Sequence, residues 1–326
     1  MALPLMTTFC VILWLGYLAT DVTLWPSFVL FLVSTYFMVE LNNRNSLMRQ
    51  YSRMVSCSYM ALMMMCPWII LDKHVMVAQL CCIATVSLLF TTYQDRSLTG
   101  RKLWAYAFYG LSVILWPPLI ILLPFYWIAE AFFLMSYSGK AFAASLFGIL
   151  MPMWILAPAV VFFQRFDMVM KQVDMIVPND RMVLMFNDVS QLWIETLPLP
   201  LPSLCIIVFV LLLLLTGVIH YFRHSYIDKI QTRMYYQFFT LLAAALTLVL
   251  VGVILLPCET LPGATIVFAM IIVCTSPLIA HYITFTNTRL TNISVIILLI
   301  AVLSVDVTQC VLRNAQSVIT LLQSYL

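Results

Sequence analysis

Long apolar runs separated by short polar stretches are the dominant pattern along this chain. Two of the clearest runs cover residues 204–216 and 238–257. A helix needs about 20 predominantly apolar residues to cross the hydrocarbon core of a bilayer. The strands of a membrane barrel would alternate apolar and polar residues, and these runs do not alternate. The pattern therefore predicts an all-α fold, a polytopic transmembrane helical bundle.

Eleven apolar segments are candidates for membrane-spanning helices. They cover residues 3–20, 24–39, 54–71, 75–92, 103–123, 125–137, 141–163, 203–222, 234–256, 264–285 and 293–307. The N-terminus lacks the positive region of a secretory signal peptide, so we interpret the first segment as a retained span, with cleavage near Ala19 as the alternative. We expect residues 1–326 to form one integral membrane domain.

Residues 103–137 decide whether the count is ten or eleven. This stretch of 35 residues carries one charge, at Glu130. A single helix of that length would measure about 52 Å, far more than a bilayer requires. Pro117, Pro118 and Pro124 interrupt it, and proline breaks or kinks helices. Two short helices in a tight hairpin are expected, with one kinked or re-entrant segment as the alternative.

Composition supports lipid as the solvent of this chain. Hydrophobic residues make up 64% and charged residues 9%, whereas soluble domains average about 25% charged residues. The nine cysteines form no paired CxxC motifs, which argues against a zinc site. No phosphate-binding glycine motif occurs either. We therefore expect no cofactor and no nucleotide-driven pump.

The basic residues predict an orientation. Cytoplasmic loops of membrane proteins carry an excess of lysine and arginine. With eleven spans, the side of the N-terminus receives eleven cations and the other side receives five, at Lys73, Arg165, Lys171, Arg181 and Arg313. Ten spans would give ten to six. We expect a bacterial inner-membrane protein with a cytoplasmic N-terminus. The cations lie between spans and form no nucleic-acid patch.

One loop outside the membrane is long enough to have structure of its own. Residues 164–202 are expected on the extracytoplasmic side. Apolar residues recur there at helical spacing between charged ones, at Phe166, Val169, Met170, Val173, Ile176 and Val177. This pattern is typical of short amphipathic helices that lie on a membrane surface.

Two acids are the candidate catalytic residues. Glu130 lies inside an apolar segment, where a charge at the helix centre costs about 2.5–3.5 kcal/mol and usually faces a cavity or a partner. It is a candidate for a proton, substrate or head-group site. The structural alternative is a protonated or arginine-paired acid that fixes helix packing. Asp21 is expected at an outer helix end, as an active-site acid or as a solvated residue.

His220 and His224 are the candidate metal ligands, because their i, i+4 spacing places both imidazoles on one helix face. No third ligand is evident, so the structural alternative is an interfacial pair. The candidate lipid head-group contacts are Arg44, Arg49, Arg53, Arg96, Arg101 and Lys102. Basic clusters beside spans attract anionic lipids, although they also serve as topology signals.

Several segments carry a family resemblance. They read ELNNRNSLMRQYSRM, RSLTGRKLWAYAFYGLSVILWPPLIILLPFYWI, GKAFAASLFGILMPMWIL, QTRMYYQFF and CTSPLIAHYITFTNTRLTNISVIILLI. Together they resemble an uncharacterised family of multi-pass inner-membrane proteins of Bacteroidota, over most of the chain. The resemblance implies the membrane layout, and it assigns a role to no residue.

A second resemblance concerns residues 110–124, which read GLSVILWPPLIILLP. This stretch is similar to a proline-broken hairpin of lipid-linked-sugar glycosyltransferases and glycan polymerases. Those enzymes use an acidic residue in a large first outer loop. Here that loop is only about four residues around Asp21, which leaves no room for the flanking surface helices.

Three functions follow as hypotheses. The leading one is a non-enzymatic component of envelope biogenesis, a scaffold or assembly factor whose partners are membrane lipids and other envelope membrane proteins. The second is a glycosyltransferase, polymerase or flippase for a lipid-linked glycan, with Glu130 and Asp21 in one cleft. The third is a secondary transporter, which predicts two similar halves with broken helices at mid-membrane.

Overall fold

In the computed structural model, the described part of the chain is helical nearly throughout. The structure describes residues 2–50, 52–164, 201–255 and 261–286, together with residues 166, 167, 170, 293, 300 and 304 singly. No β-strand occurs in these ranges. The predicted all-α fold is therefore confirmed for the described chain.

The first half of the bundle consists of helices joined by short turns. Their bounds are α1 Ala2–Thr20, η1 Val22–Leu24, α2 Trp25–Asn45, α3 Met54–Met64, α4 Pro67–Ile70, α5 Lys73–Phe90 and α6 Thr99–Leu115. The break between α3 and α4 lies at Cys66 and Pro67, because a proline cannot continue the hydrogen-bond pattern of the helix before it. A single span over residues 54–71 was expected here.

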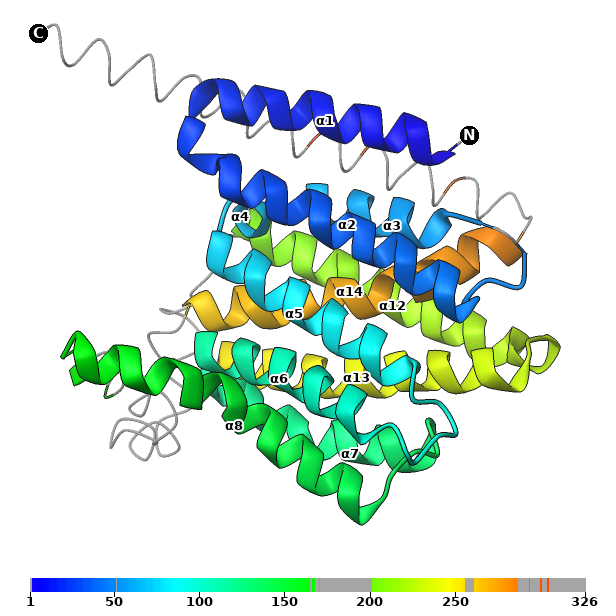
Figure 1. Cartoon of the computed structure of the whole chain (residues 1–326). Coiled ribbons are helices and arrows are strands. Elements are labelled where there is room, and N and C mark those ends of the chain that lie inside the picture. The colour runs from blue at the N-terminus through cyan, green and yellow to red at the C-terminus, as the bar shows by residue number, and fades with distance from the viewer. Residues whose placement is uncertain are drawn as a thin grey trace, which may run out of the picture.

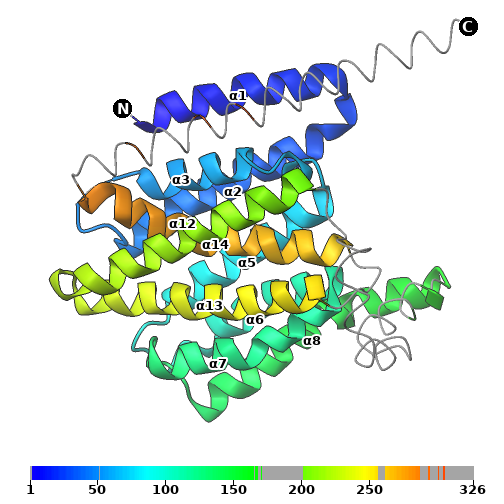
Figure 2. The same cartoon turned by 180° about the vertical axis from the view of Figure 1, so that it is seen from behind.

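The second half contains the longest helices. Their bounds are η2 Pro117–Leu122, α7 Leu123–Phe132, α8 Gly139–Phe162, α12 Leu201–His224, η3 Ser225–Ile227, α13 Ile230–Leu255 and α14 Leu261–Phe285. Figures 1 and 2 show the long helices side by side, with neighbours in sequence running in opposite directions.

Within the described residues, six helical segments are long and apolar enough to cross a membrane. They are Val22–Asn45, Lys73–Phe90, Gly139–Phe162, Ser203–Ile227, Ile230–Ile254 and Gly263–Phe285. Shorter apolar helices occur at Leu3–Ala19, Met54–Met64 and Pro117–Phe132. This composition confirms a multi-pass helical protein. The expected span at 293–307 and the expected surface helices in the loop 164–202 lie almost wholly outside the described residues.

The stretch 103–137 folds as the expected hairpin. The chain leaves α6 at Trp116, whose backbone is extended (φ −149°, ψ 98°), and turns through η2 into α7. The hydroxyl of Tyr109 donates to the carbonyl of Leu119 and ties the turn to α6. Lys102 near the start of α6 and Glu130 near the end of α7 are in contact, so the two arms lie antiparallel.

Helix α14 forms the centre of the bundle. It packs against α3, α5, α12 and α13, and Figure 1 shows it between them. Nearly all side chains of its span are buried, whereas α8 leaves most of its apolar side chains exposed. An exposed apolar face is the expected surface where lipid replaces water as the solvent.

Helices α6 and α8 approach closely at two glycines. A Cβ atom added at Gly110 would lie 2.6 Å from the carbonyl oxygen of Ile149, and one added at Gly148 would lie 2.6 Å from that of Leu103. Small residues of this kind allow helix backbones to meet inside a membrane, where close packing provides much of the attraction.

The connections between helices place the cations at one end of the bundle. The α2–α3, α5–α6, α7–α8 and α12–α13 connections lie at the right in Figure 1. We call this the basic end, because these connections and the adjoining helix ends carry Arg44, Arg49, Arg53, Arg96, Arg101, Lys102, Lys140, Arg223, Lys229 and Arg233. Lys73 lies at the opposite end, at the start of α5.

Candidate functional site

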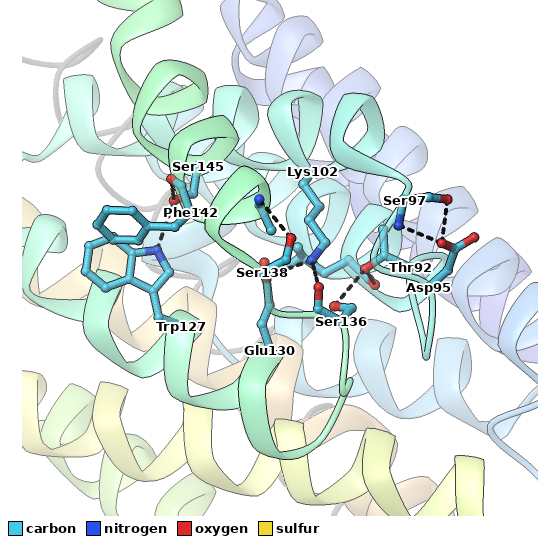
Figure 3. A network of polar contacts seen from close by, with 12 residues as sticks. Thr92, Asp95, Ser97, Lys102, Trp127, Glu130, Ser136, Ser138, Phe142 and Ser145 are labelled. Atoms are coloured by element: carbon cyan, nitrogen blue, oxygen red, sulfur yellow. Dashed lines mark hydrogen bonds and ion pairs between the residues drawn. The ribbon is translucent and has the colours of Figure 1, made fainter.

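A buried ion pair connects the two arms of the α6–α7 hairpin. The ammonium Nζ of Lys102 lies 3.1 Å from Oε2 of Glu130, and the two residues are 0% and 1% exposed. The same ammonium donates to the backbone carbonyl of Ser136, just after α7 (Figure 3). One lysine thus links the start of α6 to the end of α7 and to the connection that follows it.

The ion pair lies within a wider group of polar contacts. The hydroxyls of Ser136 and Thr92 are 3.5 Å apart (Figure 3), and the backbone N–H of Gln94 donates to the carbonyl of Leu134 at 2.8 Å. These contacts attach the α7–α8 connection to the end of α5. The three polypeptide segments that meet at Lys102 are therefore held together by hydrogen bonds as well as by charge.

The Glu130 carboxylate is enclosed rather than open to a cleft. Its Oε1 atom and the hydroxyl of Tyr106 are both buried, and the two side chains interact with each other. An isolated buried charge is strongly unfavourable, and a paired one is tolerated. The positive charge of Lys102 therefore compensates the buried negative charge of Glu130. This arrangement is close to the structural alternative raised for Glu130, with a lysine in place of an arginine.

The position of Lys102 corrects one prediction. It was expected among the lipid head-group contacts, yet its side chain is fully buried. The cause is the Glu130 carboxylate on α7, which the hydropathy pattern could not place beside Lys102. The charge of Lys102 is therefore used inside the protein. The five arginines in that group are exposed.

Short-range contacts fix the segments on either side of the pair (Figure 3). Asp95, in the α5–α6 connection, accepts from the hydroxyl and the backbone N–H of Ser97. These bonds favour the carboxylate and lower the pKa of Asp95. Ser138 accepts from the backbone N–H of Ala141 and so caps α8.

A second buried polar group lies at the basic end. Nε2 of His281, in α14, is 3.0 Å from Oδ2 of Asp228. Nδ1 of His281 is 3.4 Å from Nδ1 of His220, in α12, and Nε2 of His220 is 2.8 Å from Oγ1 of Thr286. The first three residues are at most 8% exposed. The four side chains form one continuous chain of contacts from Asp228 to Thr286.

The direction of these hydrogen bonds follows from which ring nitrogens carry protons. A carboxylate only accepts hydrogen bonds, so Nε2–H of His281 donates to the Asp228 carboxylate. The two facing Nδ1 atoms of His281 and His220 share one proton between them, and the hydroxyl of Thr286 either donates to Nε2 of His220 or accepts from it, according to the tautomer of His220. In each arrangement, hydrogen bonds link the four side chains from Asp228 to Thr286.

The predicted histidine pair is present, in a different role. The rings of His220 and His224 stack with centroids 4.3 Å apart, and Nδ1 of His224 lies 3.1 Å from the carbonyl oxygen of His220. Both ring nitrogens of His220 have the contacts described above. Among the described residues, no group of three or more histidine, cysteine or acidic side chains has a geometry that could hold a metal ion.

The two candidate catalytic acids are not brought together. Asp21 is exposed at the α1–α2 connection, where it accepts from the N–H and the hydroxyl of Thr23 at 2.9 and 2.7 Å. That connection lies at the end of the bundle opposite the α7–α8 connection (Figure 1), and Glu130 lies in the last turn of α7, beside the latter connection. A cleft containing both acids, which the glycan hypothesis required, is therefore not formed by them.

Three participants in these buried groups had not been singled out as partners: Lys102, Asp228 and His281. A signal existed for His281, because an ionisable residue within an apolar span is expected to have a partner. Asp228 lies in a polar turn, where an acid needs no special explanation. The sequence shows the residue types that make up both groups, but it does not show that these residues lie close together.

Comparison with family models, with curated proteins and with solved structures found no match to this chain. Both family resemblances, to inner-membrane proteins of Bacteroidota and to glycosyltransferases, therefore stay predictions. We therefore base the proposed function on the geometry of the two buried polar groups and of the surface around them.

Proposed function

We propose that this chain is a non-enzymatic component of a bacterial inner membrane, a scaffold or assembly factor in envelope biogenesis. The observation that carries this proposal is the closed Lys102–Glu130 pair. In this pair the charge of Glu130 holds helices together. An enzyme or a transporter that used this acid would instead present its charge to a substrate.

The energetics of the pair support a structural role. Desolvation of two charges is roughly balanced by their attraction, so such pairs often contribute little net stability. Removing one partner is costly, because the other charge is then buried alone. A pair of this kind therefore acts mainly as a constraint, which permits one arrangement of α6, α7 and the α7–α8 connection and disfavours others.

The distribution of cations supports the orientation that we propose. Among the described residues, ten of the eleven lysine and arginine side chains belong to the basic end, and Lys73 is the exception. Cytoplasmic loops are the ones enriched in lysine and arginine. We infer that the basic end faces the cytoplasm. The N-terminal end of α1 lies at the same end of the bundle (Figure 1).

The experiment is chemical crosslinking in native membranes, followed by purification of the tagged chain and identification of what is attached. Besides the wild type, it uses a double variant, Lys102→Met with Glu130→Met, which replaces the pair by apolar side chains. A scaffold predicts the same envelope protein at the same ratio with both chains. An unrelated polytopic protein, expressed at an equal level, provides the control.

Two results would count against the scaffold role. The first is a wild-type chain that is recovered as a monomer without a reproducible partner. The second is a double variant that folds and enters the membrane normally but loses every partner and every cellular effect of the wild type. That second result would mean that the Glu130 carboxylate itself is required, as an active or transporting group would be.

A further inference from the structure

A polar cavity opens at the basic end, beside the His281–Asp228 contact. Its volume is about 320 Å³, within the range of about 300–1,000 Å³ that is usual for small-ligand sites. One wall is the α2–α3 connection, from Asn42 to Ser52, and the other is the turn before α13 with the first residues of that helix, from Asp228 to Thr232. The structure thus brings two distant segments together around a polar hollow.

The lining carries both signs of charge. Arg49 and Lys229 contribute cationic side chains, and Asp228 contributes a carboxylate. Asn42 holds this wall together, because its Nδ2 donates to the carbonyl of Ser52 at 2.7 Å, and its Oδ1 is buried without a hydrogen-bond partner among the described residues. Asn42 is 7% exposed. A ligand that matches this lining carries an anionic group and a cationic donor.

Helix α14 holds the opposite charges in place. His281 fixes the Asp228 carboxylate through the 3.0 Å contact of its Nε2. The Arg49 guanidinium lies over the ring of Phe285, 5.2 Å from its centroid, and that ring packs on His281 with centroids 4.7 Å apart. Cation–π contacts of this length are attractive. Both charges are therefore oriented before a ligand arrives, which lowers the entropic cost of binding.

We propose that this cavity binds a phosphate ester with an ammonium group close by, the chemistry of phosphoethanolamine. Arg49 and Lys229 contact the phosphate, and the Asp228 carboxylate accepts from the ammonium. Guanidinium and ammonium groups are the usual partners of phosphate in proteins. The ligand is either the head group of a membrane phospholipid, since the cavity lies at an end of the bundle, or the free compound.

The test is a calorimetric titration of the purified full-length chain in detergent. The probes are dihexanoyl phosphatidylethanolamine and dihexanoyl phosphatidylglycerol, which share acyl chains and phosphate and differ in the ammonium group. The wild type is expected to bind the first about tenfold more tightly, the order expected for one charge-assisted hydrogen bond. Free phosphoethanolamine is then added as a competitor. Competition at millimolar concentration indicates that the head group alone is recognised, and its failure indicates that the ligand is the lipid.

Three variants test which residues of the cavity contribute to lipid binding. Asp228→Asn keeps an acceptor for His281 and is expected to remove the preference for the ethanolamine lipid. Arg49→Gln is expected to weaken both lipids to a similar extent. Arg101→Gln is the matched control, an exposed arginine of the basic end outside the cavity lining, and both affinities should stay at wild-type values.

Two outcomes would overturn the proposal. One is equal binding of the two lipids by the wild type. The other is an unchanged preference in Asp228→Asn. The proposal depends on membrane embedding and not on the scaffold role, because the crosslinking experiment uses no lipid probe and the titration uses no partner. Either can therefore fail while the other stands.

Discussion

At the scale of single residues, the informative feature is where charge is buried. Lys102 and Glu130 neutralise each other within apolar surroundings, and Asp228 is held by His281. Each buried charge is thus matched by a specific partner on another element. Because an unpaired buried charge costs several kcal/mol, these residues determine which helices lie next to one another.

The ion pair makes a prediction about coupling. Lys102→Met leaves the carboxylate without its cation, and Glu130→Met leaves the ammonium without its anion. Each is expected to destabilise the protein by about 3–5 kcal/mol. The Lys102→Met, Glu130→Met double variant is expected to lose much less than the sum, because neither charge is left behind.

This coupling is measured as the unfolding free energy of the four proteins in detergent. Arg101→Met provides the control, since it removes a neighbouring exposed cation of α6 and is expected to change stability little. Additive effects of the two single substitutions would mean that the pair does not hold the hairpin.

The histidine chain makes a second prediction. His281→Phe removes the hydrogen-bond partner of Asp228 and that of Nδ1 of His220. Leaving buried polar groups unsatisfied costs about 1–3 kcal/mol each. His74→Phe alters an exposed histidine at the opposite end and should have little effect. Equal unfolding free energies for both variants would contradict the proposed role of His281.

At the scale of elements, the contact between α6 and α8 depends on the absence of side chains. A Cβ atom at Gly110 would meet the backbone carbonyl of Ile149 on α8, and one at Gly148 would meet that of Leu103 on α6. Backbone atoms cannot move aside without moving their helix. These two positions therefore set the distance between α6 and α8, much as they would in a small-residue motif between membrane helices.

A glycine substitution series tests this contact. Gly148→Ala is expected to destabilise the protein by about 1–3 kcal/mol, the usual cost of overpacking. Gly252→Ala is the matched control, because a Cβ atom there meets nothing within 4 Å. It lies in α13 and should stabilise the protein by up to about 1 kcal/mol through helix propensity. The comparison is made by thermal unfolding in one detergent. A stabilising effect at both positions would contradict the close approach.

The helices themselves were largely predictable from the sequence. Apolar runs placed α5, α8, α12, α13 and α14 to within a few residues, because lipid solvation imposes a length and a composition on each span. The break at Cys66 and Pro67 inside 54–71 was missed. That segment is apolar on both sides of the proline, so hydropathy gave no sign of the interruption.

At the scale of the whole molecule, less of the arrangement could be predicted from the sequence. A hydropathy pattern orders spans along the chain but does not say which spans are neighbours. The central place of α14, the meeting of Lys102 with Glu130 and the chain from Asp228 to Thr286 all depend on neighbours distant in sequence. The cations were easier to place, because the alternation of helix directions assigns each connection to one end.

In the membrane arrangement that we propose, lipid is the solvent of the long helices and the basic end faces the cytoplasm. Lys73 and Lys229 are exposed at opposite ends of the bundle, which makes them suitable positions for single cysteines. The wild type, with its native cysteines, provides the background.

The decisive measurement is labelling of Lys73→Cys and Lys229→Cys by a membrane-impermeant maleimide in spheroplasts. We expect the cysteine at position 73 to be labelled in intact spheroplasts, and the one at position 229 to be labelled only after permeabilisation. Labelling of both from the same side, or in the reverse order, would contradict the membrane-spanning arrangement proposed for this protein.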